Sequence, residues 1–269
     1  MKIWAHTIVK NEERFIWYAI SSVVEFVDKI LIWDTGSSDL TPEIIREAQK
    51  YFGNKIEYSQ KGKASPEQIP RLRGEMLKGT SADWVINLDG DEVWWDDSIL
   101  KLTRLINGKK AKVESVVVGT VNPVGDIFHF LPQDAGGYEI SGRKGHLNLR
   151  AFSTRITGLH VSGIYPKEAY CDASDSPLQE KNPYFLDVSY LHLTHLKRSF
   201  SNLDVVGRIG KFKYELGESF PFDYFFPEAF FRHRPSMVAS AWEAMTFEYF
   251  IKALLITPLK RFRRSLKAK

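Results

Sequence analysis

The sequence of 269 residues has little of what marks secreted, redox-active and membrane-spanning proteins. Its single cysteine, Cys171, cannot form an internal disulfide, which argues against a secreted disulfide scaffold and favours a reducing compartment. No apolar run reaches the roughly 18 to 20 residues that a membrane-spanning helix needs. The opening stretch, MKIWAHTIVKNEE, lacks the apolar core and the cleavage site of a signal peptide. We therefore expect a cytoplasmic protein, either soluble or peripheral on the inner face of a membrane.

Net charge is also small, at +4, with 43% hydrophobic and 26% charged residues. This composition is typical of a globular protein, and the length fits one large α/β domain or a domain with an appendage. Charge is unevenly placed, however, because the last residues, from Leu259 onward, contain no acid and six basic side chains. These are Lys260, Arg261, Arg263, Arg264, Lys267 and Lys269.

In the first hundred residues, strand-like apolar runs alternate with helix-like ones. The strand-like runs are Ile3 to Val9, Lys29 to Trp33, Lys55 to Tyr58 and Trp84 to Leu88. Helices are expected from Asn11, from Thr41 to about Phe52 and from Glu67 to Lys78. The first of them has a possible cap followed by apolar residues at helical spacing. Such alternation predicts a mostly parallel sheet with helices on both faces.

Polar clusters follow three of these strands. They are Lys10-Asn11-Glu12, the segment from Asp34 to Asp39, and Asp89-Gly90-Asp91. Each cluster taken singly has the composition of an ordinary turn. In a parallel sheet, however, the carboxyl ends of the strands share an edge, and ligands bind there. The joint placement therefore favours one ligand site.

The run NLDGDE, with Asp89, Asp91 and Glu92, is the most informative of the three clusters. Three crowded carboxylates repel one another unless a cation lies among them, and hard divalent ions prefer oxygen ligands. Gly90 is expected to let the backbone turn sharply between the two aspartates. The alternative is a solvated acidic turn.

Together, these motifs resemble those of the inverting glycosyltransferases of family 2, which have the GT-A fold. The resemblance rests on IVKNEE at 8–13, LIWDTGSSDLT at 31–41, Arg73 and NLDGDE at 87–92. It is clear over residues 1–100 and weaker from Leu147 to His195. It implies an α/β fold of GT-A type, with a mostly parallel, Rossmann-like central sheet. The predicted catalytic domain is 1–199, with a donor-nucleotide half at 1–100 and an acceptor half at 101–199, and a helical extension follows at 200–269.

The resemblance also implies roles for individual residues. Those expected to bind the donor nucleotide are Thr7, Val9, Glu12, Asp34, Arg73 and Asp89. Asp34 would contact the nucleobase or ribose, and Asp89 would face the ribose. Those expected to hold Mn²⁺ or Mg²⁺ across the diphosphate are Asp91, Asp89 and His192, with Glu92 in support. His195 stands where relatives often have tyrosine and is ranked lower.

An inverting transfer needs a carboxylate base that takes the proton of the acceptor hydroxyl. Relatives place this base before the late histidine, often in a His-Glu pair where Tyr165-Pro166 stand here. Glu168 is the preferred candidate, and Asp172 and Glu139 remain alternatives.

Two further segments call for an interpretation. Residues 122–145 have no clear periodicity and predict a long loop. Its aromatics Phe128, Phe130 and Tyr138 are expected to anchor it to the core, with stacking on a sugar ring as the alternative. Near the end, a helix is expected from Ser236 to Ile256, followed by the basic residues. This pattern favours an interfacial anchor on an anionic membrane surface. The competing interpretations are a helix packed on the catalytic domain with a solubilising tail, and nucleic-acid binding, which is not expected.

The predicted function is metal-dependent, inverting transfer of one sugar from a nucleotide-diphosphate sugar to a hydroxyl of a glycan or lipid-linked acceptor. A UDP-sugar is the favoured donor. One alternative is a catalytically silent protein that binds a nucleotide sugar or a membrane surface. A sugar nucleotidyltransferase is less favoured, because IVKNEE replaces the glycine- and arginine-rich signature of that class.

Overall fold

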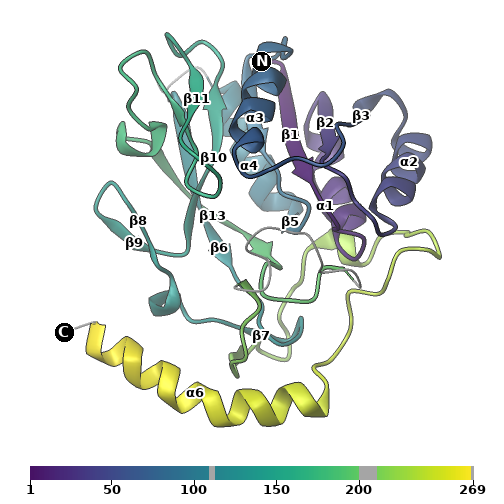
Figure 1. Cartoon of the computed structure of the whole chain (residues 1–269), viewed down its shortest axis with the longest axis vertical. Helices are drawn as coiled ribbons and strands as arrows, with labels where there is room; N and C mark the ends of the chain where they lie inside the picture. The colour runs from purple at the N-terminus through teal and green to yellow at the C-terminus, as the bar shows by residue number, and fades with distance from the viewer. Residues whose placement is uncertain (109–112, 200–210, 268–269) are drawn as a thin grey trace.

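The computed structural model describes residues 1–108, 113–199 and 211–267. Its core is an eight-stranded sheet with the order β3-β2-β1-β4-β10-β6-β13-β5 (Figure 1). The strands are β1 (Ile3–Val9), β2 (Lys29–Asp34), β3 (Ile56–Gln60), β4 (Trp84–Asn87), β5 (Glu92–Trp94), β6 (Ser115–Val121), β10 (Leu147–Ser153) and β13 (Tyr184–His192). The four strands from the first hundred residues that lie at one side of the sheet match the predicted runs to within about two residues.

Four of the seven strand pairings are parallel: β3 with β2, β2 with β1, β1 with β4, and β6 with β13. Strand β10 runs antiparallel to both of its neighbours, and β5 runs antiparallel to β13. The sheet is therefore mixed, with parallel pairing concentrated in the N-terminal half. The carboxyl ends of β1, β2 and β4 meet at one edge, as expected from the alternation of strands and helices.

Helices cover both faces of the sheet, as predicted. They are α1 (Ile16–Val23), α2 (Thr41–Phe52), α3 (Gln68–Lys78) and α4 (Asp96–Asn107). Alternate residues of β2 separate the two faces: Ile30 and Ile32 join the core that includes α1, α2 and α4, whereas Leu31 and Trp33 pack with Met76 of α3. Every residue of α1 is buried.

The prediction that the first helix begins at Asn11 is wrong, because α1 begins at Ile16. Asn11 has a left-handed backbone conformation, with φ of 55°, and its side chain accepts a hydrogen bond from the Ser38 amide at 2.7 Å. The next amide, that of Glu12, donates to the Thr41 hydroxyl at 2.7 Å. These polar residues therefore connect the two loops that follow β1 and β2 instead of capping a helix.

The segment 122–145, predicted as a loop, contains β7 (His129–Phe130) and a small hairpin of β8 (Tyr138–Ile140) and β9 (Arg143–Gly145). Phe130 stacks on Phe220, with ring centroids 4.5 Å apart, and so anchors the segment as expected. Tyr138 does not, because it is largely exposed. A second hairpin joins β11 (His160–Ser162) to β12 (Ala169–Cys171), and β14 (Glu218–Ser219) pairs with β7.

The expected helix from Ser236 to Ile256 is wrong in its position. The final helix, α6, spans Phe247–Lys267, and residues 236–246 are not helical. Trp242 packs against a cluster of aromatic rings, and the amide of Met245 donates to buried Asp126 at 3.0 Å. These contacts hold this irregular segment against the core up to the start of α6. No helix in the described part of the chain is long and apolar enough to cross a membrane.

The predicted boundary at residues 199 and 200 adjoins residues 200–210, which lie outside the described residues, as does Lys269. The two-part division of the chain therefore stays a prediction.

Candidate active site

A cavity of about 380 Å³ opens at the carboxyl edge of β1 and β4. It is bounded by the residues that follow these strands, by α3, by β10, by the end of β13 and by the segment before β12. Seven predicted site residues line it: Val9, Glu12, Arg73, Asp89, Asp91, Glu168 and His192. The structure thus brings together side chains from five parts of the sequence at the edge where a ligand site was expected.

Thr7 and Asp34 are buried but are not among the lining residues. Asp34 organises the loop after β2, because its Oδ1 accepts hydrogen bonds from the amides of Gly36 and Ser37 at 2.9 and 2.8 Å. Its Oδ2 accepts one from the Tyr58 hydroxyl at 3.1 Å. The nucleotide-binding roles given to Thr7 and Asp34 stay predictions.

Glycine occupies position 90, between the two aspartates, because there is no room for a side chain there. It is not among the residues with positive φ, so the sharp turn expected of it is not the reason for glycine here. A Cβ at this position would lie 2.9 Å from Cγ of Glu12 and 3.1 Å from Cγ1 of Val9. The loop therefore packs directly against the residues that follow β1.

Gly90→Ala is expected to displace the loop or Glu12 and to lower turnover roughly 10- to 100-fold, because small displacements of positioned groups strongly lower the reaction rate. Steady-state nucleotide release from the donor measures this effect. Gly74→Ala in α3 is the matched control, because its added Cβ meets nothing within 4 Å. Equal turnover in Gly90→Ala and the wild type would contradict the assignment.

Two arginines hold Asp89. Its Oδ2 lies 3.3 Å from a terminal nitrogen of Arg150, and its Oδ1 lies 3.8 Å from one of Arg73. Burial alone would raise the pKa of Asp89, but the two guanidinium groups outweigh it and lower the pKa. Arg150 also forms an ion pair with Glu92, which is completely buried, and burial raises the pKa of Glu92 well above its usual value. Glu92 thus contacts Arg150 from below the surface, and its supporting role stays a prediction.

Asp91 has a different environment. Its Oδ2 pairs with the guanidinium of Arg198, which also lies 3.1 Å from Oε1 of Glu12. The same oxygen lies 3.7 Å from Nε2 of His192. Burial lowers the pKa of His192 to about 4, so its imidazole is neutral at pH 7, which is the form that binds metals.

The sheet fixes the relation between Asp91 and His192. His192 lies opposite Glu92 in the pairing of β13 with β5, and the amide of the next residue, Leu193, donates to the carbonyl of Asp91 at 2.8 Å. Two side chains about a hundred residues apart in sequence are thus adjacent through the backbone ladder.

This donor set fits a divalent ion that also takes oxygens from its ligand. Asp91 and His192 approach one another within the distance that separates neighbouring ligands of one ion, and Mg²⁺ commonly uses one or two carboxylates plus substrate phosphates. Asp89 is directed toward the arginines instead. Among the described residues, three ligand atoms of His, Cys, Asp or Glu side chains lie within 4.8 Å of one another only at His160, Cys171 and Asp175. These three residues lie in and beside the β11–β12 hairpin, away from Asp91 and His192.

Of the three candidate bases, only Glu168 lines the cavity. Nε of Arg73 lies 3.2 Å from Oε1 of Glu168, whereas the buried Oε2 of Glu168 has no hydrogen-bond partner among the described residues. Asp172 pairs with Lys181 at 2.8 Å, and Glu139 is an exposed partner of Lys144. The geometry therefore favours Glu168 over the other two.

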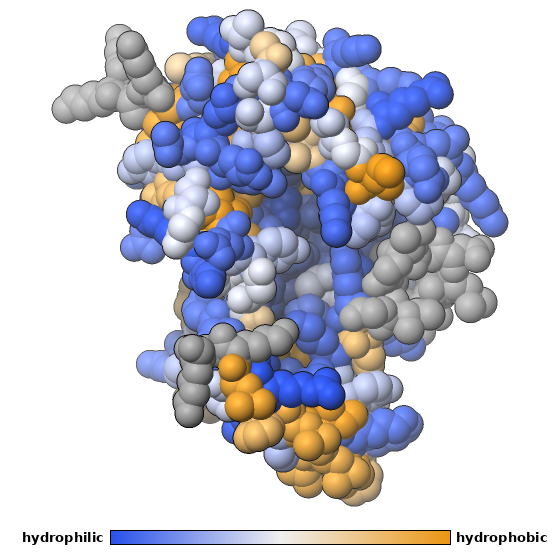
Figure 2. Space-filling model, turned by 60° about the vertical axis from the view of Figure 1, so that its left-hand side comes forward, coloured by the Kyte–Doolittle hydropathy of each residue, from blue (hydrophilic) through white to orange (hydrophobic). Residues whose placement is uncertain are grey.

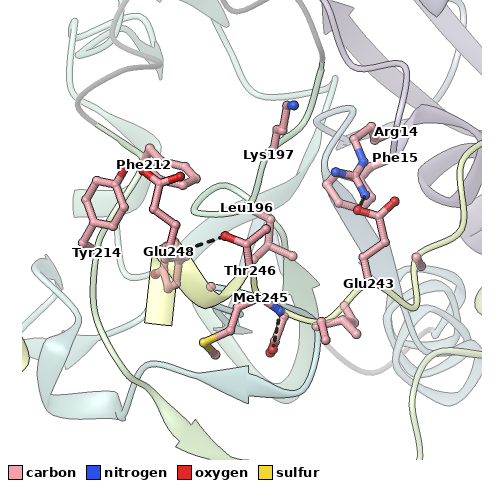
Figure 3. A pocket seen from close by; sticks show the side chains of 16 residues that line it. Arg14, Phe15, Leu196, Lys197, Phe212, Tyr214, Glu243, Met245, Thr246 and Glu248 are labelled. Atoms are coloured by element: carbon pink, nitrogen blue, oxygen red, sulfur yellow. Dashed lines mark hydrogen bonds and ion pairs between the residues drawn. The ribbon is translucent and has the colours of Figure 1, made fainter. Parts of the chain in front are cut away.

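A second cavity, of about 330 Å³, lies between the N-terminal part of the fold and the C-terminal segment (Figure 3). Arg14 and Glu243 lie side by side at one wall of it and form an ion pair. None of the predicted site residues lines it. The residues that line it come both from the core and from the C-terminal segment.

Comparison with known proteins decides the family. The family model described as glycosyl transferase family 2 matches residues 5–162, which is more than half of the sequence. The chain belongs to glycosyl transferase family 2. The matched span includes the strands, Arg73, and the Asp89-Gly90-Asp91 loop on which the predicted resemblance rests.

Solved structures show the GT-A fold for this family 2 chain. S. aureus TarS 1–349 in complex with UDP-GlcNAc is 16% identical, with a TM-score of 0.52 over 76% of this chain and 62% of that one. The longer S. aureus TarS structure is 15% identical, with a TM-score of 0.50 over 72% and 37%.

Among curated proteins, a TPR repeat-containing protein of Synechococcus elongatus is 31% identical over 85 residues. That match covers 32% of this chain and 19% of the cyanobacterial protein. The family 2 chain thus spans about three fifths of the shorter TarS structure and a fifth of the cyanobacterial protein.

Two arginines that line the cavity at the carboxyl edge of β1 and β4 were missed from the sequence. Arg150 stands in β10, where a strand residue with an inward charge is unusual, and its Nε donates to the Tyr190 hydroxyl at 2.7 Å. Arg198 follows the late histidine in HLTHLKR. Only two signals could have indicated these arginines. Arg150 is a basic residue in an apolar strand, and Arg198 comes shortly after a possible metal ligand.

Proposed function

We propose that the protein transfers a single sugar from a nucleotide-diphosphate sugar, with a UDP-sugar favoured, to a hydroxyl of a glycan or lipid-linked acceptor. The transfer depends on Mn²⁺ or Mg²⁺ and inverts the anomeric configuration. One observation carries the proposal: a carboxylate and imidazole pair, a second carboxylate held by arginines, and a candidate base line the same cavity. The TarS structure in complex with UDP-GlcNAc, which shares the fold, supports a donor of this class.

The charges of the cavity suit a diphosphate. Asp91 and His192 would hold the divalent ion, which neutralises the negative charge that develops on the leaving nucleoside diphosphate. Arg73, Arg150 and Arg198 all line the cavity and supply fixed positive charge beside it. Guanidinium groups bind phosphate oxygens through two nitrogens at once, so they also orient the donor.

The inverting step assigned to Glu168 is a single displacement. Its carboxylate takes the proton of the acceptor hydroxyl, the hydroxyl oxygen forms a bond to the anomeric carbon, and the bond from that carbon to the diphosphate oxygen breaks. The electron pair of the broken bond leaves with the nucleoside diphosphate. Arg73 orients Glu168 through Oε1, and Oε2 has no hydrogen-bond partner among the described residues.

The purified chain is expected to release nucleotide slowly from at least one donor in a panel of UDP-, GDP- and other nucleotide sugars. Release should be slow because water replaces the missing acceptor. It should require Mn²⁺ or Mg²⁺ and stop when EDTA is added. Donor binding is measured in parallel by calorimetry. Binding without release would indicate the catalytically silent alternative, and the absence of both binding and release for every donor would overturn the proposal.

A further inference from the structure

Helix α6 presents its polar side to the protein and its apolar side to solvent. The side that packs inward carries Tyr249, Ala253, Thr257, Lys260 and Arg264. The side that faces away, which we call the outer face, consists of Phe247, Ile251, Leu254, Leu255, Leu259, Phe262 and Leu266. An ordinary surface helix has the reverse arrangement, with its apolar stripe against the core.

Specific contacts fix this orientation. The Thr257 hydroxyl accepts a hydrogen bond from the amide of Leu216 at 2.7 Å. Arg264 and Lys260 both pair with Glu215, which is buried. The Tyr249 hydroxyl donates to the backbone carbonyl of Lys213. Rotation of α6 to bury its outer face would break all of these contacts and leave Glu215 buried without a counter-charge, so the outer face stays exposed.

The exposure of the outer face is large. Phe247 is 79% exposed, Leu255 71%, Leu259 65% and Phe262 63%. Hydrophobic residues gather at the lower end of the molecule in Figure 2, where α6 lies along the bottom in Figure 1. A contiguous apolar surface of this kind marks a site of association.

The charges beside the outer face indicate what it binds. Lys252 and Arg263 flank it on one side and Arg261 on the other, by the helical spacing of 100° per residue. The only acid in α6 is Glu248, in the first turn, and it pairs with Lys252. An apolar face bordered by basic side chains complements an anionic surface with an apolar interior.

We propose that the outer face of α6 lies in the plane of an anionic lipid bilayer and holds the enzyme there. With about 1.5 Å of rise per residue, its 21 residues would extend roughly 30 Å along the membrane surface. A second copy of the chain is a poorer occupant, because pairing two outer faces would bring Arg261 and Arg263 of both copies together, and the only acid of α6, Glu248, already pairs with Lys252. If the proposed function holds, this placement keeps the enzyme at the surface where a lipid-linked acceptor lies.

The test uses the full chain and sedimentation with phosphatidylcholine vesicles that contain or lack about 30% phosphatidylglycerol. We expect binding to the anionic vesicles, weakening as salt is raised, and little binding to neutral ones. L255S/F262S should weaken binding at least tenfold, and R261E/R263E should remove the preference for anionic lipid. Tyr51→Ser, which changes an exposed aromatic residue of α2 outside both cavities, is the matched control.

Donor hydrolysis is measured on the same variants. It should be unchanged, which separates a failure of membrane binding from a failure of the proposed function. Equal sedimentation of the wild type and L255S/F262S would overturn the proposal. So would a lipid-independent dimer in analytical ultracentrifugation that these two substitutions dissociate, because the outer face would then bind a second copy.

Discussion

Asp91→Asn is expected to lower metal-dependent nucleotide release roughly 10³-fold, which is the scale of losing one fixed charge-stabilising group in a transition state. Asparagine keeps the shape of the side chain but loses the charge that binds the ion. His192 alone would then remain of the close pair, and its Nε2 would lack the carboxylate partner 3.7 Å away. The measurement is the initial rate of nucleotide release as Mn²⁺ is titrated, with Mn²⁺ affinity followed by electron paramagnetic resonance.

A fold control accompanies this variant, because Asp91 also pairs with buried Arg198. Arg198 keeps Glu12 as a second partner, so the melting temperature should fall by only a few degrees. Glu139→Gln removes an exposed carboxylate outside the cavity and should release nucleotide at the rate of the wild type. Wild-type rate and Mn²⁺ affinity in Asp91→Asn would exclude Asp91 as the metal ligand.

Glu168→Gln is expected to lower kcat roughly 10²- to 10⁴-fold, the usual contribution of a positioned general base. Glutamine still offers an oxygen to Nε of Arg73, so the local packing is preserved while the ability to accept a proton is lost. Because the proposed diphosphate site consists of other groups, the Kd for the donor should stay close to that of the wild type. Calorimetry gives the Kd, and nucleotide release under saturating donor gives kcat.

Asp172→Asn is the matched control for the base, since Asp172 is an acid of the same segment that lies outside the cavity. If it lowers kcat as strongly as Glu168→Gln, the assignment fails. A collapse of donor affinity in Glu168→Gln with unchanged kcat would show instead that Glu168 serves to orient Arg73.

Local sequence patterns were sufficient for the part of the fold that builds the carboxyl edge of β1, β2 and β4. β1, β2 and β4 are apolar runs bounded by turn residues, and α2 opens at Thr41-Pro42 as predicted. The acidic loop at Asp89 and the placement of polar clusters at one edge followed from the same patterns. These features depend on periodicity and on neighbours in sequence, which is why they are readable without the structure.

What could not be predicted depends on distant partners. Arg150 and Arg198 were missed because the carboxylates they neutralise lie about 60 and 110 residues earlier in the sequence. The start of α6 was displaced because Trp242 and Met245 are held by aromatic rings and by Asp126, not by helical neighbours. The basic residues that suggested a free tail continue the helix, since Lys260 and Arg264 pair with Glu215.

The register between β13 and β5 has a consequence for how this chain can vary. Insertions in the hairpins between Asp91 and His192 would leave both side chains in place, because the ladder opposite Glu92 sets their relation and the length of the connection does not. A single residue inserted within β13 before His192 would instead turn the imidazole to the opposite face of the sheet, where it could not reach the cavity. The permissive hairpins end at Cys171 and the forbidden strand begins at Tyr184, so the two kinds of site for length change follow one another along the chain.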